Sequence, residues 1–207
     1  MKAFIIILTF LLSGCVFAST PEDPRDSLLD ILIGSYMGEM ENEPGVLTPI
    51  SHSFERVDAP HFGEFVLLYQ VINGDKDTLG SQAKIFVLTN DAERNAIRTK
   101  VYLLSFDDVP TTGAANEWVK IDPESLRGFP EDCDIFWTEI EGGFTGNVKP
   151  SDCTFPSQVF KGNIRPKMTY QVFDDSLLWE EALYRDNMKV IVSTDGLLSA
   201  SRQSGLE

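Results

Sequence analysis

Basic and aromatic side chains occupy alternate positions in residues 98–106, and the apolar residues of this stretch predict a β-strand. Arg98, Lys100 and Tyr102 share one face of this strand, because side chains two residues apart point the same way. If this face points into a barrel, Arg98 and Lys100 would bind ligand carboxylates near one mouth of the barrel. Tyr102 would supply a ring and a hydroxyl. Both faces end in apolar residues, so the pattern leaves open the alternative that the two cations lie in solvent with their stems along apolar surface.

Two further stretches place a tryptophan two residues before a glutamate. Trp137 and Glu139 share one strand face, and so do Trp179 and Glu181. A carboxylate within an apolar stripe is costly unless it is paired, so each glutamate is expected at a barrel rim or opposite a basic residue. One hypothesis pairs Glu181 with Arg98 inside the cavity. The candidate ligand-binding residues are therefore Arg98, Lys100, Tyr102, Trp137, Trp179 and Glu181.

Composition excludes most other kinds of site. His52 and His61 are the only histidines, which rules out a histidine-rich metal site, and we expect no metal centre. The chain has neither a glycine-rich phosphate loop nor a nucleophile-elbow motif, so no catalytic residue can be assigned. The formal net charge is −15 at pH 7, without a basic patch, which makes nucleic acids and anionic lipid headgroups unfavourable partners.

The cysteines divide into one near the N-terminus and two around a predicted hairpin. Residues 134–140 and 144–148 flank a Glu-Gly-Gly turn, and Cys133 and Cys153 lie just outside the two strands. Pairing of the strands would bring the two sulfurs to the same side, which predicts a disulfide. The bridge would contribute roughly 3 kcal/mol by restricting the unfolded chain, and its spacing differs from the Cys-x-x-Cys of redox sites.

Residues 1–18 have the layout of a secretory signal peptide, with one positive charge at Lys2, an apolar run too short to span a bilayer, and then small residues. Cys15 follows Leu-Ser-Gly, as in the lipobox of bacterial lipoproteins, and would then carry a lipid; cleavage after Ala18 is the alternative. We therefore expect export, either to the periplasm with a lipid anchor as the only membrane attachment or as a secreted protein. A disulfide can persist in such compartments.

The rest of the chain predicts one short helix followed by an antiparallel β-body. Asp23 as N-cap, Pro24 at the first helical position and Gly34 as the stop indicate the helix. A domain at residues 27–198 is expected after a spacer at 19–26, with a flexible tail at 199–207. Short apolar runs separated by turn residues predict the strands of a barrel or sandwich; the runs include residues 62–72, 83–88, 97–106, 118–121, 134–140, 144–148, 168–173, 177–184 and 188–192.

Two of these stretches resemble the CpcT/CpeT family of chromophore lyases. Residues 97–102 correspond to the family's Tyr-Arg-x-Arg-Val-Tyr motif. Its cysteine hairpin corresponds to Cys133-Asp134, Phe144-Thr145-Gly146 and Cys153. The resemblance extends from Ser27 to about Arg185. It implies a calycin-like barrel with a ligand-sized interior and a tendency to form homodimers. The expected fold is therefore mainly β: a single antiparallel calycin-like barrel with a short N-terminal helix.

The resemblance also implies a ligand and a reaction. Family members attach linear tetrapyrroles (bilins) to cysteines of phycobiliproteins, or chaperone them, which implies a bilin ligand, a phycobiliprotein-like acceptor and a lyase activity. Light-harvesting proteins receive their bilins in the cytoplasm, so export favours binding over attachment here. The residues leave two alternatives open: a non-catalytic carrier of a small amphipathic molecule, and a structural envelope lipoprotein whose barrel is filled by Trp118, Trp137 and Trp179.

Overall fold

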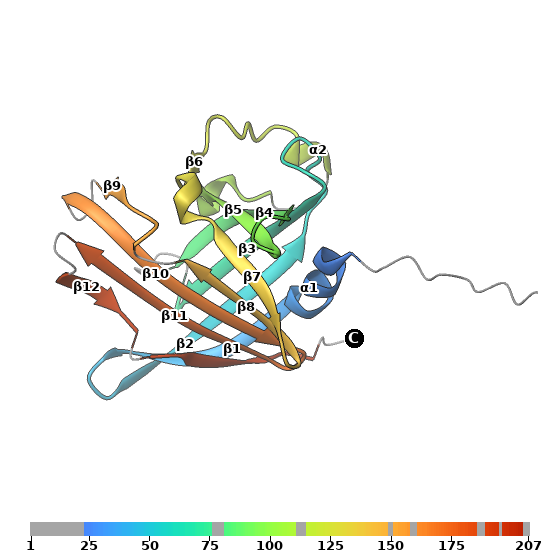
Figure 1. Ribbon diagram of the computed structural model, residues 1–207. Helices are drawn as coiled ribbons and strands as arrows, with labels where there is room; N and C mark the ends of the chain where they lie inside the picture. Colours follow the sequence, from blue (N-terminus) through green and yellow to red (C-terminus); the bar gives the residue numbers. More distant parts are fainter. Residues whose placement is uncertain are drawn as a thin grey trace, which may run out of the picture.

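A computed structural model of the protein describes residues 23–75, 81–110, 115–148, 151–157, 161–185, 189–194 and 196–204. Within them, an antiparallel sheet of 13 strands curls until its ends meet (Figure 1). Ten of the strands form a closed barrel, which confirms the fold expected from the sequence. The expected signal peptide, with Cys15, lies outside these residues.

The barrel strands follow one another around the ring nearly in chain order. β11 pairs with β10 along one edge and with β13 along the other, and β13 pairs with β1. The last barrel strand therefore closes the ring beside the first. In order of pairing the strands are β1 (Gly34–Glu43), β2 (Val46–Arg56), β3 (Phe65–Asn73), β4 (Gln82–Asp91), β5 (Ala96–Leu104), β7 (Ile135–Ile140), β8 (Gly143–Val148), β10 (Gly162–Phe173), β11 (Ser176–Arg185) and β13 (Leu198–Arg202).

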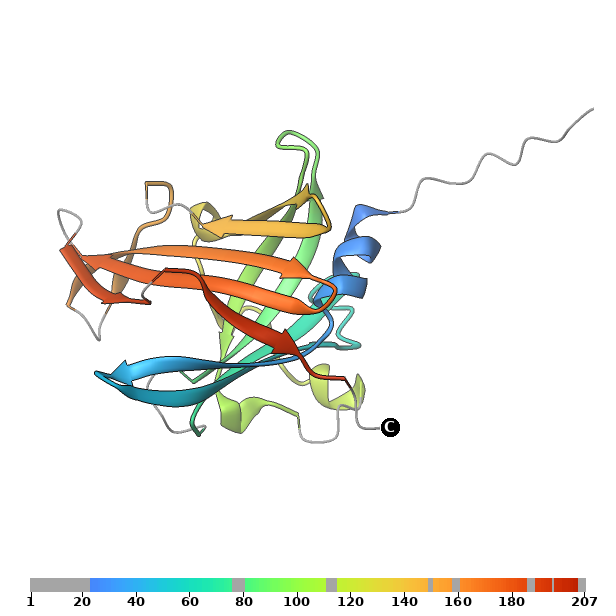
Figure 2. The same cartoon turned by 90° about the horizontal axis from the view of Figure 1, so that it is seen from below.

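Three short strands extend the barrel wall: β6 (Arg127–Gly128) beside β5, β9 (Phe155–Ser157) beside β10, and β12 (Lys189–Ser193) beside β11. Helix α1 (Pro24–Leu32) lies at one end of the barrel, and β9 and β12 lie at the other (Figures 1 and 2). We call these the helix end and the strand end. The short helices η1 (Phe106–Asp108), α2 (Ala115–Trp118) and η2 (Glu131–Cys133) lie between β5 and β7 in the chain.

Two expectations about local structure are wrong. Residues 118–121, expected as a strand, end helix α2 and continue as a turn, because Trp118 is buried whereas Val119 is 64% exposed and the next residues offer no alternating face. Residues 199–202, expected in a flexible tail, belong to β13, where Ala200 is buried. A Cβ added at Gly38 would lie 2.5 Å from the Ser199 carbonyl oxygen. The small side chains that predicted a tail instead allow β1 and β13 to pack closely at the seam, the place where these two strands close the barrel.

Side chains alternate between the barrel core, which faces inward, and the outer wall. β2 buries Ile50, His52 and Phe54, and the residues between them are less buried. β3 and β4 are buried on both faces, because their outward residues pack with Trp118 in a second hydrophobic group, the outer cluster. Of the three tryptophans considered as fillers of the barrel, Trp137 and Trp179 lie in the barrel core and Trp118 lies outside it.

Helix α1 closes the helix end of the barrel. The Asp23 carboxylate caps it by accepting a hydrogen bond from the Arg25 backbone N–H at 2.9 Å, and Pro24 is its first residue, as the sequence predicts. Among the described residues, no helix is long and apolar enough to cross a membrane. The helix residues that join the barrel core, each at most 2% exposed, are Leu28, Leu29 and Leu32.

Side chains from β1 and β13 hold the C-terminal end of α1. The Tyr36 hydroxyl donates to the Ile31 carbonyl at 2.7 Å, and the Arg202 guanidinium donates to the Ile33 carbonyl. Arg202 also donates to the Asp174 carbonyl at 2.9 Å, in the turn between β10 and β11. These donors satisfy carbonyls that a helix C-terminus leaves without intrahelical partners. The helix is therefore fastened to the strands that close the ring.

Trp137 of β7 lies directly over Gly146 of β8. The two residues pair in register, and a Cβ added at Gly146 would lie 2.7 Å from carbons of the indole ring. The indole N–H donates to Oγ1 of Thr99 at 3.0 Å, which fixes the ring in this position. The glycine of the Phe144-Thr145-Gly146 stretch is thus explained by the tryptophan that faces it.

Replacing Gly146 by alanine tests this packing. Gly146→Ala should lower the free energy of unfolding by about 1–3 kcal/mol, because the added methyl group forces the indole or a strand to move. Urea unfolding of Gly146→Ala in the wild-type and Trp137→Val backgrounds gives the coupling between the two residues. An equal cost in both backgrounds would show that the indole is not the obstacle.

Cys133 and Cys153 form the expected disulfide, and both are fully buried. The bridge joins η2, just before β7, to the segment that leads into β9, across a sequence separation of 20 residues. It therefore connects parts of the wall that do not pair with each other as strands.

The double substitution Cys133→Ala, Cys153→Ala should lower the free energy of unfolding by about 3 kcal/mol, because the unfolded chain gains the freedom that a closed loop of this length removes. Urea unfolding under non-reducing conditions measures the difference, and a reducing agent should bring the wild type to the level of the variant. A reducing agent that destabilises the variant as much as the wild type would contradict this account.

Candidate functional site

An ion pair lies in the barrel interior. Lys84 of β4 is 2% exposed, and its ammonium nitrogen lies 3.8 Å from Oε1 of Glu181 on β11. The Glu181 side chain is 31% exposed, so water reaches the pair. Glu181 directly precedes the part of β11 that pairs with β12, which places the pair toward the strand end.

Aromatic residues contact both members of this pair. The ammonium nitrogen of Lys84 lies 5.5 Å from the centre of the Tyr69 ring, a distance at which a cation interacts with a ring face. The His52 ring lies 4.3 Å from the Trp179 ring. A lysine in such apolar surroundings is costly, which makes it a candidate functional residue. The buried rings of the barrel core are Tyr36, Phe54, Phe65, Tyr69, Phe86, Trp137, Phe144, Tyr170 and Trp179.

Hydroxyl groups continue from the ion pair into the core. The Tyr170 hydroxyl donates to Oε1 of Glu181 at 3.1 Å, and the Tyr69 hydroxyl lies 2.9 Å from Nδ1 of His52. The rings of the two tyrosines also meet edge to face, with their centres 6.3 Å apart. Burial, together with the nearby Glu181 charge, raises the pKa of both tyrosines well above 10, so both keep their protons at neutral pH. We call Lys84, Glu181, Tyr170, Tyr69 and His52 the interior network.

His52 ends the interior network as a neutral ring. Burial, and then the Lys84 charge, lowers the pKa of His52 to about 3. The residue is 1% exposed, and its Nε2 atom has no hydrogen-bond partner. Buried polar atoms are nearly always hydrogen-bonded, so this nitrogen marks a place for a ligand atom or an ordered water.

Strand register brings the interior network together from β2, β3, β4, β10 and β11. Lys84 pairs with Tyr69 across β3 and β4, and Trp179 pairs with Tyr170 across β10 and β11. Paired residues of antiparallel strands point to the same face, so closure of the barrel makes all of these side chains face one another.

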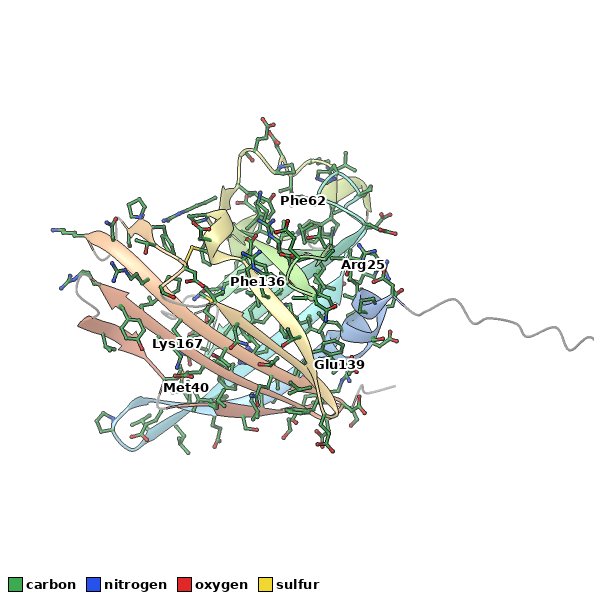
Figure 3. All side chains as sticks on the ribbon, viewed as in Figure 1. Arg25, Met40, Phe62, Phe136, Glu139 and Lys167 are labelled. Carbon is green, nitrogen blue, oxygen red and sulfur yellow. A yellow bond between two sulfur atoms is a disulfide. The ribbon has the colours of Figure 1, made fainter. Side chains whose placement is uncertain are left out.

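Three of the six candidate residues from the sequence point into the barrel. Trp137 and Trp179 lie in the barrel core, and Glu181 lies in the interior network. Their contact with a ligand stays a prediction. Glu139, which shares a strand face with Trp137, is exposed at the helix end, on the same side as Arg25 of α1 (Figure 3).

The other three candidates lie on the outer wall. Arg98, Lys100 and Tyr102 point away from the barrel core, because Thr99 and Val101 between them are buried and point inward. The ammonium of Lys100 lies 5.2 Å from the Tyr102 ring on this outer face. These two residues therefore stand outside the interior network, and the sequence pattern alone did not decide between the two faces.

Arg98 pairs with Asp134, so the hypothesis of an Arg98–Glu181 pair is wrong. Nε of Arg98 donates to the Asp134 carboxylate at 2.5 Å. The pair lines a groove of about 740 Å³ on the outer faces of β5, β7 and β8, together with Phe136. The guanidinium of Arg94 lies 4.5 Å from the centre of the Phe136 ring in the same groove.

The sequence pattern did not point to Lys84, His52, Tyr69 or Tyr170. One signal was present: Lys84 stands inside residues 83–88, an otherwise apolar run that is buried on both faces. The histidine and the two tyrosines gave no such signal, because residues of these types are common on half-buried strands.

The buried histidine predicts a loss of stability in acid. The pKa of His52 is about 3 in the folded state, below its ordinary value of 6.5, so below pH 6.5 the unfolded state gains a proton that the folded state refuses. Stability is therefore full above about pH 6.5 and falls progressively toward pH 3, by about 2 kcal/mol at pH 5. In urea unfolding at pH 7 and pH 5, His52→Gln should lack this fall, and His61→Gln, at an exposed position, should retain it. The same pH dependence in wild type and His52→Gln would contradict the assignment.

Comparisons with known proteins support the fold. Neither protein-family models nor curated proteins gave a match to the chain. Among solved structures, it is similar to the CRL protein of Arabidopsis, with a TM-score of 0.59 and 11% sequence identity over 89% of this chain and 100% of that one. It is also similar to the T-type phycobiliprotein lyase CpeT from Prochlorococcus phage P-HM1, with a TM-score of 0.47 and 10% identity over 86% and 97% of the two chains. The chain thus shares the fold of the CRL protein.

Proposed function

We propose that this protein is an exported, non-catalytic binding protein that holds a carboxylate-bearing tetrapyrrole, such as a bilin, inside its barrel. The observation that carries the proposal is the position of Lys84, a buried cation that lies over an aromatic ring. Water reaches it from the side of Glu181, which is partly exposed. A bilin has two propionates and a long conjugated body, which suit a cation set among rings. The ligand class itself comes from the sequence resemblance to the CpcT/CpeT family.

Lys84 retains the capacity to bind a ligand carboxylate. Its ammonium nitrogen lies 3.8 Å from Glu181, beyond ordinary hydrogen-bond distance, so the pair is held by charge alone. A ligand carboxylate would accept hydrogen bonds from the Lys84 ammonium, while Glu181 keeps its hydrogen bond from Tyr170. Binding would thus replace a weak pairing by a charge-assisted hydrogen bond.

Binding is proposed rather than attachment to an acceptor, because the N-terminal segment predicts export. The phycobiliproteins to which lyases of the CpcT/CpeT family attach bilins reside in the cytoplasm. An exported protein of this fold would meet a free tetrapyrrole but not such an acceptor.

A second candidate function is a structural one in the cell envelope. The packing of the barrel core favours it, since Tyr69, Trp137 and Tyr170 all belong to that core and are each at most 1% exposed. A filled barrel attached through a lipid on Cys15 would serve as an envelope component without any ligand.

The carboxylate anchor is tested with matched lysine variants. Biliverdin should change its visible absorbance and acquire circular dichroism on mixing with micromolar wild-type protein. Lys84→Met should weaken this binding about tenfold to hundredfold, because it removes a buried charge-assisted hydrogen bond. Lys100→Met makes the same change on the outer wall and should leave the affinity unaltered.

Biliverdin dimethyl ester, whose carboxylates are esterified, distinguishes loss of the carboxylate contact with Lys84 from a general loss of fit of the ligand in the barrel. The ester should bind the wild type as weakly as biliverdin binds Lys84→Met, and the variant should not distinguish the two probes. Loss of binding in Lys100→Met, but not in Lys84→Met, would show that the ligand binds on the outer wall at β5. No spectral change with the wild type would favour the structural role.

A further inference from the structure

Basic residues of β6, β10 and β11 gather on one side of the strand end. β10 begins there, because its first residues pair with β9 and its later residues pair with β8. Across β10 and β11, Arg165 pairs with Tyr184, and Arg185 pairs with Ile164. Lys161 directly precedes β10 and is exposed. We define the basic edge as Arg127, Lys161, Arg165 and Arg185.

Arg127 of β6 joins the basic edge through β9. Its guanidinium donates to the Pro156 carbonyl at 3.4 Å, and Pro156 pairs with Asn163 of β10. Neighbouring strands lie about 5 Å apart, and residues two apart on one strand lie about 7 Å apart. The four residues are therefore within about one to two Debye lengths of one another at physiological salt, so their charges act together on a nearby anion.

The basic edge is locally positive on a chain whose formal net charge is −15. Neither Lys161 nor Arg165 forms an ion pair with another described residue. The neighbouring Lys167 lies 2.5 Å from Glu180, so these two charges cancel. By contrast, the turns at the helix end carry the exposed carboxylates Glu139, Glu141, Asp174 and Asp175. The basic residues are spread from position 127 to position 185, which is why no run of them stands out in the sequence.

We propose that the basic edge is the entrance through which an anionic ligand reaches Lys84. This inference rests on the binding function proposed above and names the route by which the ligand enters the barrel. Glu181 lies on the same strand as Arg185, and its 31% exposure marks a path for solvent to the Lys84 ammonium. A strongly acidic protein repels anions on average, so a positive surface beside that path decides where an anion can approach.

The extent of the basic edge favours a small dissolved anion over a membrane surface. The other side of the strand end holds the β1–β2 hairpin, where Glu39 and Glu41 are exposed (Figure 1). Salt screens these carboxylates from a small anion that lies within one Debye length of the basic edge. A bilayer of anionic lipids would face both sides at once and meet repulsion from the hairpin. The ligand is therefore expected to come from solution.

The association kinetics of biliverdin test the entrance. Arg127→Gln combined with Arg165→Gln should lower the association rate constant about threefold to tenfold at about 10 mM salt. The dissociation rate constant should stay the same, because the basic edge acts before the ligand is bound. At about 500 mM salt the two proteins should associate equally fast. Biliverdin dimethyl ester, which carries no carboxylate charge, should not distinguish them at either salt concentration.

A control variant removes the same charge away from the strand end. Arg56 ends β2 at the helix end, and Lys120 follows α2; both are exposed. Arg56→Gln combined with Lys120→Gln should associate with biliverdin as the wild type does. Equal slowing in both double variants would overturn the inference, because net charge would then govern the rate. Sedimentation of the wild type, but not of the Arg127→Gln, Arg165→Gln variant, with phosphatidylglycerol vesicles would instead assign the surface to a membrane and refute the entrance.

A measurement without ligand reads the potential of the basic edge directly. Anionic and cationic nitroxides broaden backbone amide signals according to their local concentration, which follows the local potential of the full-length protein. We expect enrichment of the anionic nitroxide at residues 163–165 and its depletion at residues 139–142 and 174–175. The Arg127→Gln, Arg165→Gln variant should lose the enrichment. Depletion of the anionic nitroxide at residues 163–165 of the wild type would contradict the inference.

The two measurements separate failure of this inference from failure of the proposed function. Binding of biliverdin at a rate that the Arg127→Gln, Arg165→Gln variant does not change would support the function and overturn the entrance. Enrichment of the anionic nitroxide at the basic edge, without any binding of biliverdin, would support the attraction of anions to this surface and overturn the bilin assignment.

Discussion

Closure of the sheet at β13 is the constraint on which the rest of the structure depends. β13 pairs with β1 on one side and β11 on the other, so neither strand is left with an open edge there. Only in a closed ring do alternate residues of distant strands face a common interior, which brings Lys84 within 3.8 Å of Glu181. The same closure places His52 among the buried rings. Architecture and site therefore have a single origin.

The ion pair of the interior network adds little to the stability that an apolar filling of the same volume would give. Replacement of a buried ion pair by apolar residues of similar volume is often neutral or stabilising, because two charges no longer lose their hydration. The network also leaves Nε2 of His52 without a partner, which costs further free energy. These costs are consistent with the ligand-binding role proposed for the core, whose helix end is closed by Leu28, Leu29 and Leu32.

The fold could be predicted where local chemistry decides it. The hairpin of β7 and β8 follows from its glycine turn, and α1 follows from its cap and proline. The direction of the β5 side chains could not be predicted, because Tyr102 packs in an outer cluster that requires the distant Trp118. Lys84 was hidden for a related reason, since its apolar run is buried on both faces. Expectations failed wherever a second layer outside the barrel, or the seam, altered what one strand buries.

The position of Arg202 has a consequence for how the barrel folds. This residue of β13 donates to the Ile33 carbonyl beside α1 and to the Asp174 carbonyl, and these partners lie 169 and 28 positions away in the sequence. Contacts of such high contact order form slowly, because a long loop must close before they contribute any free energy. Docking of the helix and closure of the ring are therefore coupled late events of folding.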